Sequence, residues 1–176
     1  MTAKLTFVLG GADSGKSAFA EKLALGADPV VYIATAPVTD EEMVKKIRAH
    51  QERRPASWET IEVLDLSLKR AILDLNAPLA LLDSLTMYVA RIMDTPDPQA
   101  HMRDVLDAMT ISASEFIVVS DEVGLGVVPA TESGRAFRRL LGMINQEVAT
   151  AADEVYLVAA GLPLTLKSGA ADKGAT

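Results

Sequence analysis

The sequence predicts a three-layer α/β fold in which a mostly parallel β-sheet is flanked by helices on both faces. Three observations carry this prediction. Short apolar runs recur along the chain with helical spacers between them, a pattern typical of parallel strands that are buried on both faces. The first run leads directly into a glycine-rich loop and a helix. The length of 176 residues suits one well-buried domain.

The glycine-rich loop Gly10-Gly11-Ala12-Asp13-Ser14-Gly15-Lys16-Ser17 matches the phosphate-loop pattern G-x-x-x-x-G-K-[ST]. A strand is expected before it at Leu5–Leu9, and a helix after it at Ala18–Ala24. The backbone N–H groups of such a loop surround bound phosphate, and the helix adds the positive end of its dipole. We expect Lys16 to contact the terminal phosphates of a nucleotide and Ser17 to bind Mg²⁺. The loop indicates a P-loop NTPase, for which we expect a RecA-like sheet, and the alternative is a glycine-rich turn that matches by chance.

Five further strands are expected, each a short apolar run between helical or turn segments. They are Val30–Ala34, Thr60–Leu64, Leu79–Leu82, Phe116–Val119 and Val155–Ala159.

Three further helices have recognisable boundaries. Thr39 and Glu42 have the spacing of a capping box, which predicts a helix that runs to about Glu52 before Pro55. The other two are predicted at Gln99–Ala113, after a proline-rich loop, and at Glu132–Ala151, which carries apolar residues on one face. We expect residues 1–167 to form one nucleotide-binding domain and residues 168–176, with almost nothing to bury, to be a disordered tail.

Composition excludes several classes of function. The formal net charge is −7, and the one short basic cluster, Lys45, Lys46, Arg48, Arg53 and Arg54, is too small to predict a nucleic-acid partner. The absence of cysteine removes disulfides and thiolate chemistry. Because neither a signal peptide nor a transmembrane segment is evident, a cytoplasmic protein is expected.

Polar residues follow several predicted strands, where ligands collect in doubly wound sheets. Thr35, Ala36 and Pro37 follow the second strand, and Glu62 lies near the end of the third. The apolar run Leu79–Leu82 ends in Asp83, as in a Walker B strand, so Asp83 is a candidate Mg²⁺ ligand. The alternative for Asp83 is a helix N-cap.

Two acidic residues, Asp121 and Glu122, follow the fifth predicted strand. Judged from their spacing, a turn or cap role for them is as well supported as a chemical one.

His50 lies late in the predicted Thr39–Glu52 helix, on the face of Met43 and Ile47. Arg53 and Arg54 follow three and four residues later and share its side of the helix. Two guanidinium groups would bind phosphate and disfavour protonation of the imidazole, which would leave it nucleophilic. On the residues alone, a packed histidine and a catalytic one both remain open.

Together these segments resemble the bifunctional adenosylcobinamide kinase/adenosylcobinamide-phosphate guanylyltransferases of cobalamin biosynthesis, from Leu5 to about Lys167. The family usually has arginine at the position of Asp13 and asparagine at that of Asp121. The matching segments are Gly10–Ser17, Tyr32–Ala36, Asp40–Met43, Ile47–His50 with Arg54, Pro55 and Trp58, Leu82–Thr86, Glu122–Pro129, Arg135–Arg138, Gly142–Gln146 and Ala152–Asp153.

The resemblance implies that His50 is the guanylylated nucleophile. It also implies that the nucleotide contacts the phosphate loop and a further set of residues, which are Thr35, Ala36, Pro37, Gln51, Glu52, Arg53, Arg54, Glu62 and Asp83. The implied substrates are GTP or ATP with Mg²⁺ and the corrinoid adenosylcobinamide, and the implied assembly is a homotrimer. A P-loop kinase of one activity with a structural His50, and a nucleotide-gated binding protein, are the alternatives.

Overall fold

The computed structural model describes residues 3–37, 48 and 54–169. Apart from Arg48, the helix predicted between Thr39 and Glu52 lies outside the described residues, as do residues 170–176 of the predicted tail.

Seven strands form one sheet in the order β3-β2-β4-β5-β1-β6-β7, which confirms the predicted α/β class. All neighbouring pairs are parallel except β6 and β7, which form an antiparallel edge. The strands are β1 (Leu5–Gly10), β2 (Val30–Ala34), β3 (Glu59–Glu62), β4 (Leu79–Asp83), β5 (Glu115–Asp121), β6 (Glu154–Ala159) and β7 (Leu162–Lys167).

The strand β7 was not predicted from the sequence. It follows β6 through Ala160 and Gly161, which both have positive φ, at 52° and 77°, as in the tight turns of β-hairpins. Leucine alternates with other residues along the strand, and Leu162, Leu164 and Leu166 are all more than half exposed. An alternating edge strand lacks the continuous apolar run that identifies the buried strands, so a search for such runs does not find it.

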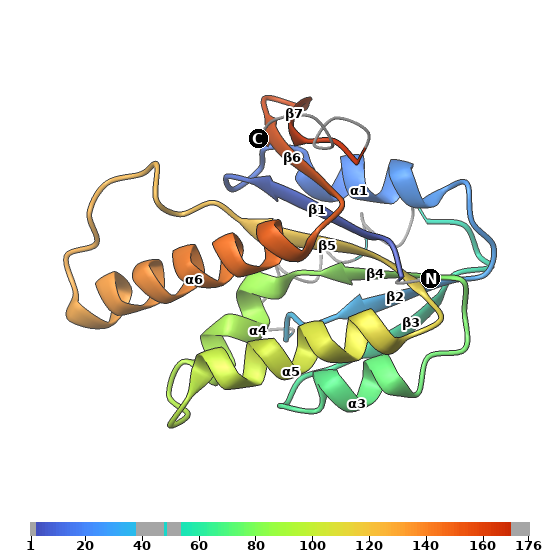
Figure 1. Ribbon diagram of the computed structural model, residues 1–176. Coiled ribbons are helices and arrows are strands. Elements are labelled where there is room, and N and C mark those ends of the chain that lie inside the picture. Colours follow the sequence, from blue (N-terminus) through green and yellow to red (C-terminus); the bar gives the residue numbers. More distant parts are fainter. Residues whose placement is uncertain (1–2, 38–47, 49–53, 170–176) are drawn as a thin grey trace, which may run out of the picture.

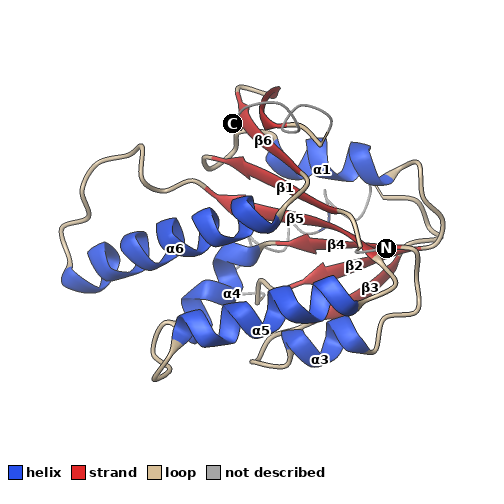
Figure 2. Cartoon of the chain, in the orientation of Figure 1, coloured by secondary structure: helices blue, strands red, loops and turns tan. Residues whose placement is uncertain are grey.

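Helices cover both faces of the sheet (Figures 1 and 2). Helix α1 covers one face of the sheet, and the four other described helices cover the opposite face. The predicted Glu132–Ala151 helix has these bounds in the structure, whereas α3 and α4 were not predicted. The described helices are α1 (Lys16–Ala24), α3 (Leu68–Leu73), α4 (Leu85–Ile92), α5 (Pro98–Ile111) and α6 (Glu132–Ala151).

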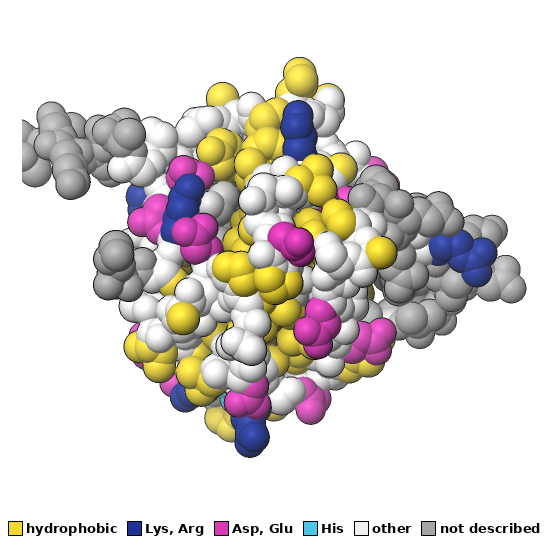
Figure 3. All heavy atoms as spheres, turned by 90° about the vertical axis from the view of Figure 1, so that its right-hand side faces the viewer, with side chains coloured by type: hydrophobic (Ala, Val, Ile, Leu, Met, Phe, Trp, Pro, Cys, Tyr) yellow, Lys and Arg dark blue, Asp and Glu magenta, His cyan; other side chains and the backbone are white. Residues whose placement is uncertain are grey.

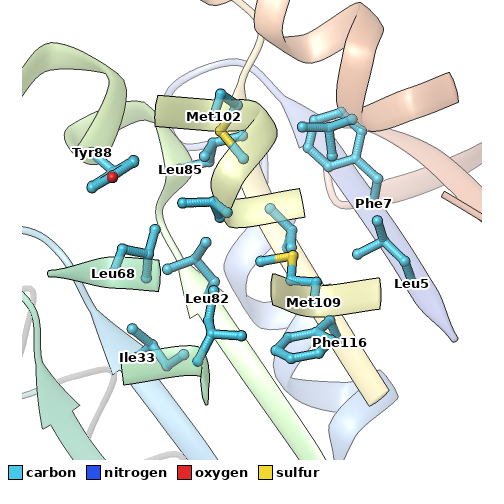
Figure 4. Close-up of a cluster of buried hydrophobic side chains, with 14 of the residues drawn as sticks. Leu5, Phe7, Ile33, Leu68, Leu82, Leu85, Tyr88, Met102, Met109 and Phe116 are labelled. Carbon is cyan, nitrogen blue, oxygen red and sulfur yellow. The ribbon is translucent and has the colours of Figure 1, made fainter. Parts of the chain in front are cut away.

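The two faces of the central strands bury separate apolar clusters. On one face, Val8 and Leu81 pack with Ala20 and Ala24 of α1. On the other face, Phe7 belongs to the same buried cluster as side chains of α5, including Met102 (Figure 4). Burial on both faces is the reason that these strands are continuous apolar runs in the sequence.

The parallel arrangement of β1 to β6 brings the carboxyl ends of these strands to one edge of the sheet. The segment 122–131 and the amino-terminal part of α6 project beyond this edge (Figure 1). Figure 3 shows the opposite side of the molecule, on the right of Figure 1, where side chains of both charges are scattered among apolar and uncharged ones. The loops that follow β1, β2, β4 and β5 therefore line the edge expected to bind a ligand.

Candidate active site

The phosphate loop joins β1 to α1 in a conformation that requires glycine at two positions. Gly15 is the N-cap of α1 and has a φ of 90°. At Gly10, an added Cβ would lie 2.7 Å from the carbonyl oxygen of Val158 on the adjacent strand β6. The loop is tied to the β6–β7 turn, because the backbone N–H of Gly161 donates to the carbonyl of Ser14 over 2.8 Å. The N-terminus of α1 is thus held at the carboxyl edge of the sheet, the arrangement that binds phosphate.

Lys16 points toward the end of β5. Its Nζ lies 2.6 Å from Oδ1 of Asp121, and these side chains are only 12% and 28% exposed. The same ammonium donates to the carbonyl of Gly11 over 3.1 Å. The predicted phosphate-binding lysine therefore lies folded over its own loop.

Asp83 is the last residue of β4 and is half-buried. It lies beside Ala34 of β2, which in turn pairs with Glu62 at the exposed end of β3. The N-cap of α4 is Ser84, so the N-cap alternative for Asp83 is wrong by one residue. Asp83 is left as a carboxylate at the strand end, the Walker B position that the sequence predicted.

A buried cluster surrounds Asp83 on the α1 side of the sheet. The guanidinium of Arg54 stacks over the Tyr32 ring at 3.4 Å from its centroid, and its Nε lies 3.7 Å from Oε1 of Glu21. The Arg54 and Glu21 side chains are 7% and 8% exposed. Burial, together with the Asp83 carboxylate, raises the pKa of the Tyr32 phenol, which keeps the phenol protonated. The predicted nucleotide contact Arg54 is thus brought to the same strand ends as Asp83.

Thr35 joins the ends of β2 and β4. Its buried hydroxyl donates to the carbonyl of Ser84 over 2.6 Å and accepts the Ser84 N–H over 3.0 Å. Arg91 donates to the carbonyls of Thr35 and Val63. The hydroxyl proton and one lone pair are therefore used within the protein, so the Thr35 hydroxyl has no free donor for a ligand.

Asp121 and Glu122 have different roles in the structure. The Glu122 carboxylate accepts the N–H groups of Gly124 and Leu125 over 2.8 and 2.9 Å, which is the turn role that the sequence left open. Asp121 instead forms the ion pair with Lys16. Sequence reasoning identified neither this pair nor the contact of Glu21 with Arg54, because no local pattern marks contacts between distant segments.

A cavity of about 340 Å³ adjoins this edge between the start of the 122–131 segment and α6. Its lining includes Glu122, Gly124, Arg138 and Asn145. Arg138 donates through Nη2 to the carbonyl of Gly124 over 3.0 Å, while its buried Nη1 has no hydrogen-bond partner in the part of the chain that the structure describes. Arg138 is thus a cationic side chain of the cavity lining, next to the segment that follows β5.

The residues His50, Gln51, Glu52 and Arg53 lie outside the described residues. Within residues 3–37, 48 and 54–169, no group of three or more histidine or acidic side chains could hold a metal ion. Ser17, half-buried in the first turn of α1, and Asp83 remain the predicted metal ligands. None of the helices in the same ranges is long and apolar enough to cross a membrane.

A phosphate loop at the start of α1, with a carboxylate at the end of a nearby parallel strand, defines a P-loop nucleotide-binding protein. Solved structures share this fold. The flagellar accessory protein FlaH from Methanocaldococcus jannaschii matches with a TM-score of 0.57 and 15% identity, over 98% of this chain and 82% of that one. A type III secretion system ATPase matches with a TM-score of 0.59 and 12% identity, over 98% of this chain and 59% of that one.

The sequence comparisons narrow this class to one family. Residues 6–166 match the family model described as cobinamide kinase / cobinamide phosphate guanyltransferase. The bifunctional adenosylcobalamin biosynthesis protein CobP of Pseudomonas aeruginosa is 39% identical, over 91% of this chain and 95% of that protein. The CobU proteins of Salmonella typhimurium and Escherichia coli are 36% and 32% identical, each over 93% of this chain and 99% of the relative.

The chain belongs to the cobinamide kinase / cobinamide phosphate guanyltransferase family. It is therefore an enzyme, a transferase that uses a nucleotide as substrate. The family resemblance noted in the sequence is confirmed.

Replacing Lys16 with alanine is expected to abolish phosphoryl transfer, with kcat lowered at least about a hundredfold, because Lys16 supplies the positive charge of the phosphate loop. The measurement is a steady-state kinase assay on the folded variant. Lys69→Ala is the matched control, since Lys69 forms an exposed pair with Asp104 instead. Near-normal activity in Lys16→Ala would contradict the phosphate-loop assignment.

Proposed function

We propose that this enzyme phosphorylates adenosylcobinamide with a nucleoside triphosphate and then transfers GMP from GTP to adenosylcobinamide phosphate through a GMP–His50 intermediate. The product is adenosylcobinamide-GDP. The observation that carries the kinase step is the position of Lys16 in a phosphate loop at the carboxyl edge of the sheet. The family to which the chain belongs supports the pairing of this step with a guanylyl transfer.

In the first reaction, the aminopropanol hydroxyl of the corrinoid attacks the γ-phosphorus of the triphosphate, and a nucleoside diphosphate leaves. The loop N–H groups and Lys16 bind the phosphates and stabilise the charge that develops on them. Ser17 and Asp83 would hold Mg²⁺, which neutralises phosphate charge when bound. The hydroxyl proton passes to solvent.

In the second reaction, an imidazole nitrogen of neutral His50 attacks the α-phosphorus of GTP, and pyrophosphate leaves as the nitrogen–phosphorus bond forms. The phosphate of adenosylcobinamide phosphate then attacks this phosphorus, and His50 is released. Covalent catalysis of this kind replaces one difficult displacement with two easier ones. We propose that the enzyme is cytoplasmic, because both reactions need nucleoside triphosphates and Mg²⁺, which the cytoplasm supplies.

Replacing Asp83 with asparagine is expected to raise the Mg²⁺ concentration needed for half-maximal kinase rate by about tenfold or more, because a neutral amide is a poorer Mg²⁺ ligand. Kinase rates are measured across a Mg²⁺ titration, and urea unfolding is measured in parallel. The unfolding midpoint should change little. An unchanged Mg²⁺ requirement would rule out Asp83 as a metal ligand.

His50→Ala is expected to lose the GMP adduct and guanylyl transfer but to keep at least part of the kinase activity, because phosphorylation needs no covalent intermediate. The adduct is detected by intact mass after incubation with GTP and Mg²⁺. His101→Ala is the control, as the other of the two histidines in the chain. An adduct that persists in His50→Ala would identify another nucleophile.

Kinase activity, nucleotide binding and adduct mass, measured together on the parent protein, separate the alternatives. Phosphorylation without any GMP adduct in the parent protein would indicate a kinase of one activity with a structural His50. Nucleotide binding without turnover of corrinoid would indicate a binding protein.

We infer that the enzyme works as a homotrimer, as the family resemblance implies. The projecting 122–131 segment supports association, because three of its apolar side chains are exposed within four residues of the chain, and exposed apolar patches are typical of protein–protein contacts. Val127 is 95% exposed, Leu125 84% and Val128 68%.

The trimer is expected to show about three times the 18.7 kDa mass of one chain in light scattering. Val127→Asp should shift it toward the monomer, since a charge in an apolar contact is poorly solvated. A stable monomer in the parent protein would contradict the trimer, and an unaffected trimer in the variant would place the contact elsewhere.

A further inference from the structure

The phosphate-binding lysine already has an anionic partner within the protein. Lys16 Nζ lies 2.6 Å from Asp121 Oδ1, a distance typical of a charge-assisted hydrogen bond. Lys16 follows β1, whereas Asp121 ends β5, 105 positions later in the chain. Because both side chains are mostly shielded from solvent, the ion pair is screened less than a fully exposed one.

The sheet fixes the position of Asp121. Its Cα pairs with that of Gly10 in the parallel register of β1 and β5, so it lies level with the start of the phosphate loop. Its N–H donates to Thr86 Oγ1 over 2.7 Å, and its carbonyl accepts from Asn145 Nδ2 over 3.1 Å. Contacts from β1, α4 and α6 therefore hold the backbone that carries this carboxylate.

We propose that Asp121 is an internal counter-ion that competes with the terminal phosphates of the nucleotide for Lys16. This inference rests on the assignment of residues 10–17 as the nucleotide-binding loop. A phosphate that reaches Lys16 either displaces the carboxylate or lies beside it. Displacement breaks the Lys16–Asp121 ion pair, and close approach places the phosphate beside the Asp121 carboxylate, which repels it. Both routes therefore reduce the affinity of the protein for the nucleotide.

The competition makes Asp121 a specificity determinant. The penalty falls on nucleoside di- and triphosphates, whose β- or γ-phosphates reach the lysine. It spares a nucleoside monophosphate, whose single phosphate does not. The same penalty favours release of the diphosphate after phosphoryl transfer, when the Asp121 carboxylate returns to Lys16.

The test compares Asp121→Asn with the parent protein by calorimetric titration with guanosine 5′-(α,β-methylene)triphosphate and Mg²⁺, without corrinoid. The methylene bridge blocks loss of pyrophosphate, so no nucleotide adduct forms. Asparagine keeps the size of the side chain and removes its charge. We expect a Kd about three- to tenfold lower in the variant, on the scale of a partly exposed ion pair, and an unchanged Kd for GMP.

Asp104→Asn is the matched control, because it removes the same charge from the exposed pair with Lys69. Its Kd for the analogue should equal that of the parent. Equal tightening by both variants would show a general effect of net charge and overturn the proposal. Unchanged or weaker binding in Asp121→Asn would also overturn it.

The same titrations distinguish failure of the proposed function from failure of the role of Asp121. A parent protein that binds no triphosphate analogue would overturn the phosphate-loop assignment and this inference with it. Binding that Asp121→Asn leaves unaltered would overturn the role of Asp121 alone.

Discussion

The parallel pairing of β1 with β5 and β6 is the constraint on which the site depends. It places Gly10 level with Asp121 on one side and with Val158 on the other. The phosphate loop therefore begins between two strand ends, and its first glycine has no room for a side chain against the Val158 carbonyl. The chain can leave β1 only through a tight, glycine-dependent bend, and this bend aims the N-terminus of α1 at the ligand edge.

Two cations near this edge are held by anionic partners within the protein. Lys16 is paired with Asp121, and Arg54 is paired with Glu21 over the Tyr32 ring. Removing a charge from solvent is costly unless a partner compensates, so these pairs allow two cations to remain largely buried. A bound nucleotide adds several negative charges to the same edge, and its affinity therefore depends on how these pairs rearrange.

Central elements of the fold could be predicted from the sequence because their environment repeats along the chain. β2 and α6 have the predicted bounds, since a strand buried on both faces and a long amphipathic helix each leave a clear pattern. β3 lies one to two residues earlier than predicted, at Glu59–Glu62. The short helices α3 and α4 were missed, because six and eight residues give too little periodicity to separate a helix from a loop.

The sequence by itself determined the nucleotide-binding loop, the class of the fold and the family resemblance, because each depends on residues that are contiguous or arranged in a fixed order. Only the tertiary structure decided which side chains meet. The use of the Thr35 hydroxyl by Ser84, the stacking of Arg54 on Tyr32 and the capture of Lys16 by Asp121 all join separate segments. Such contacts follow from sheet order and register, which bring distant strand ends together and leave no pattern within any one segment.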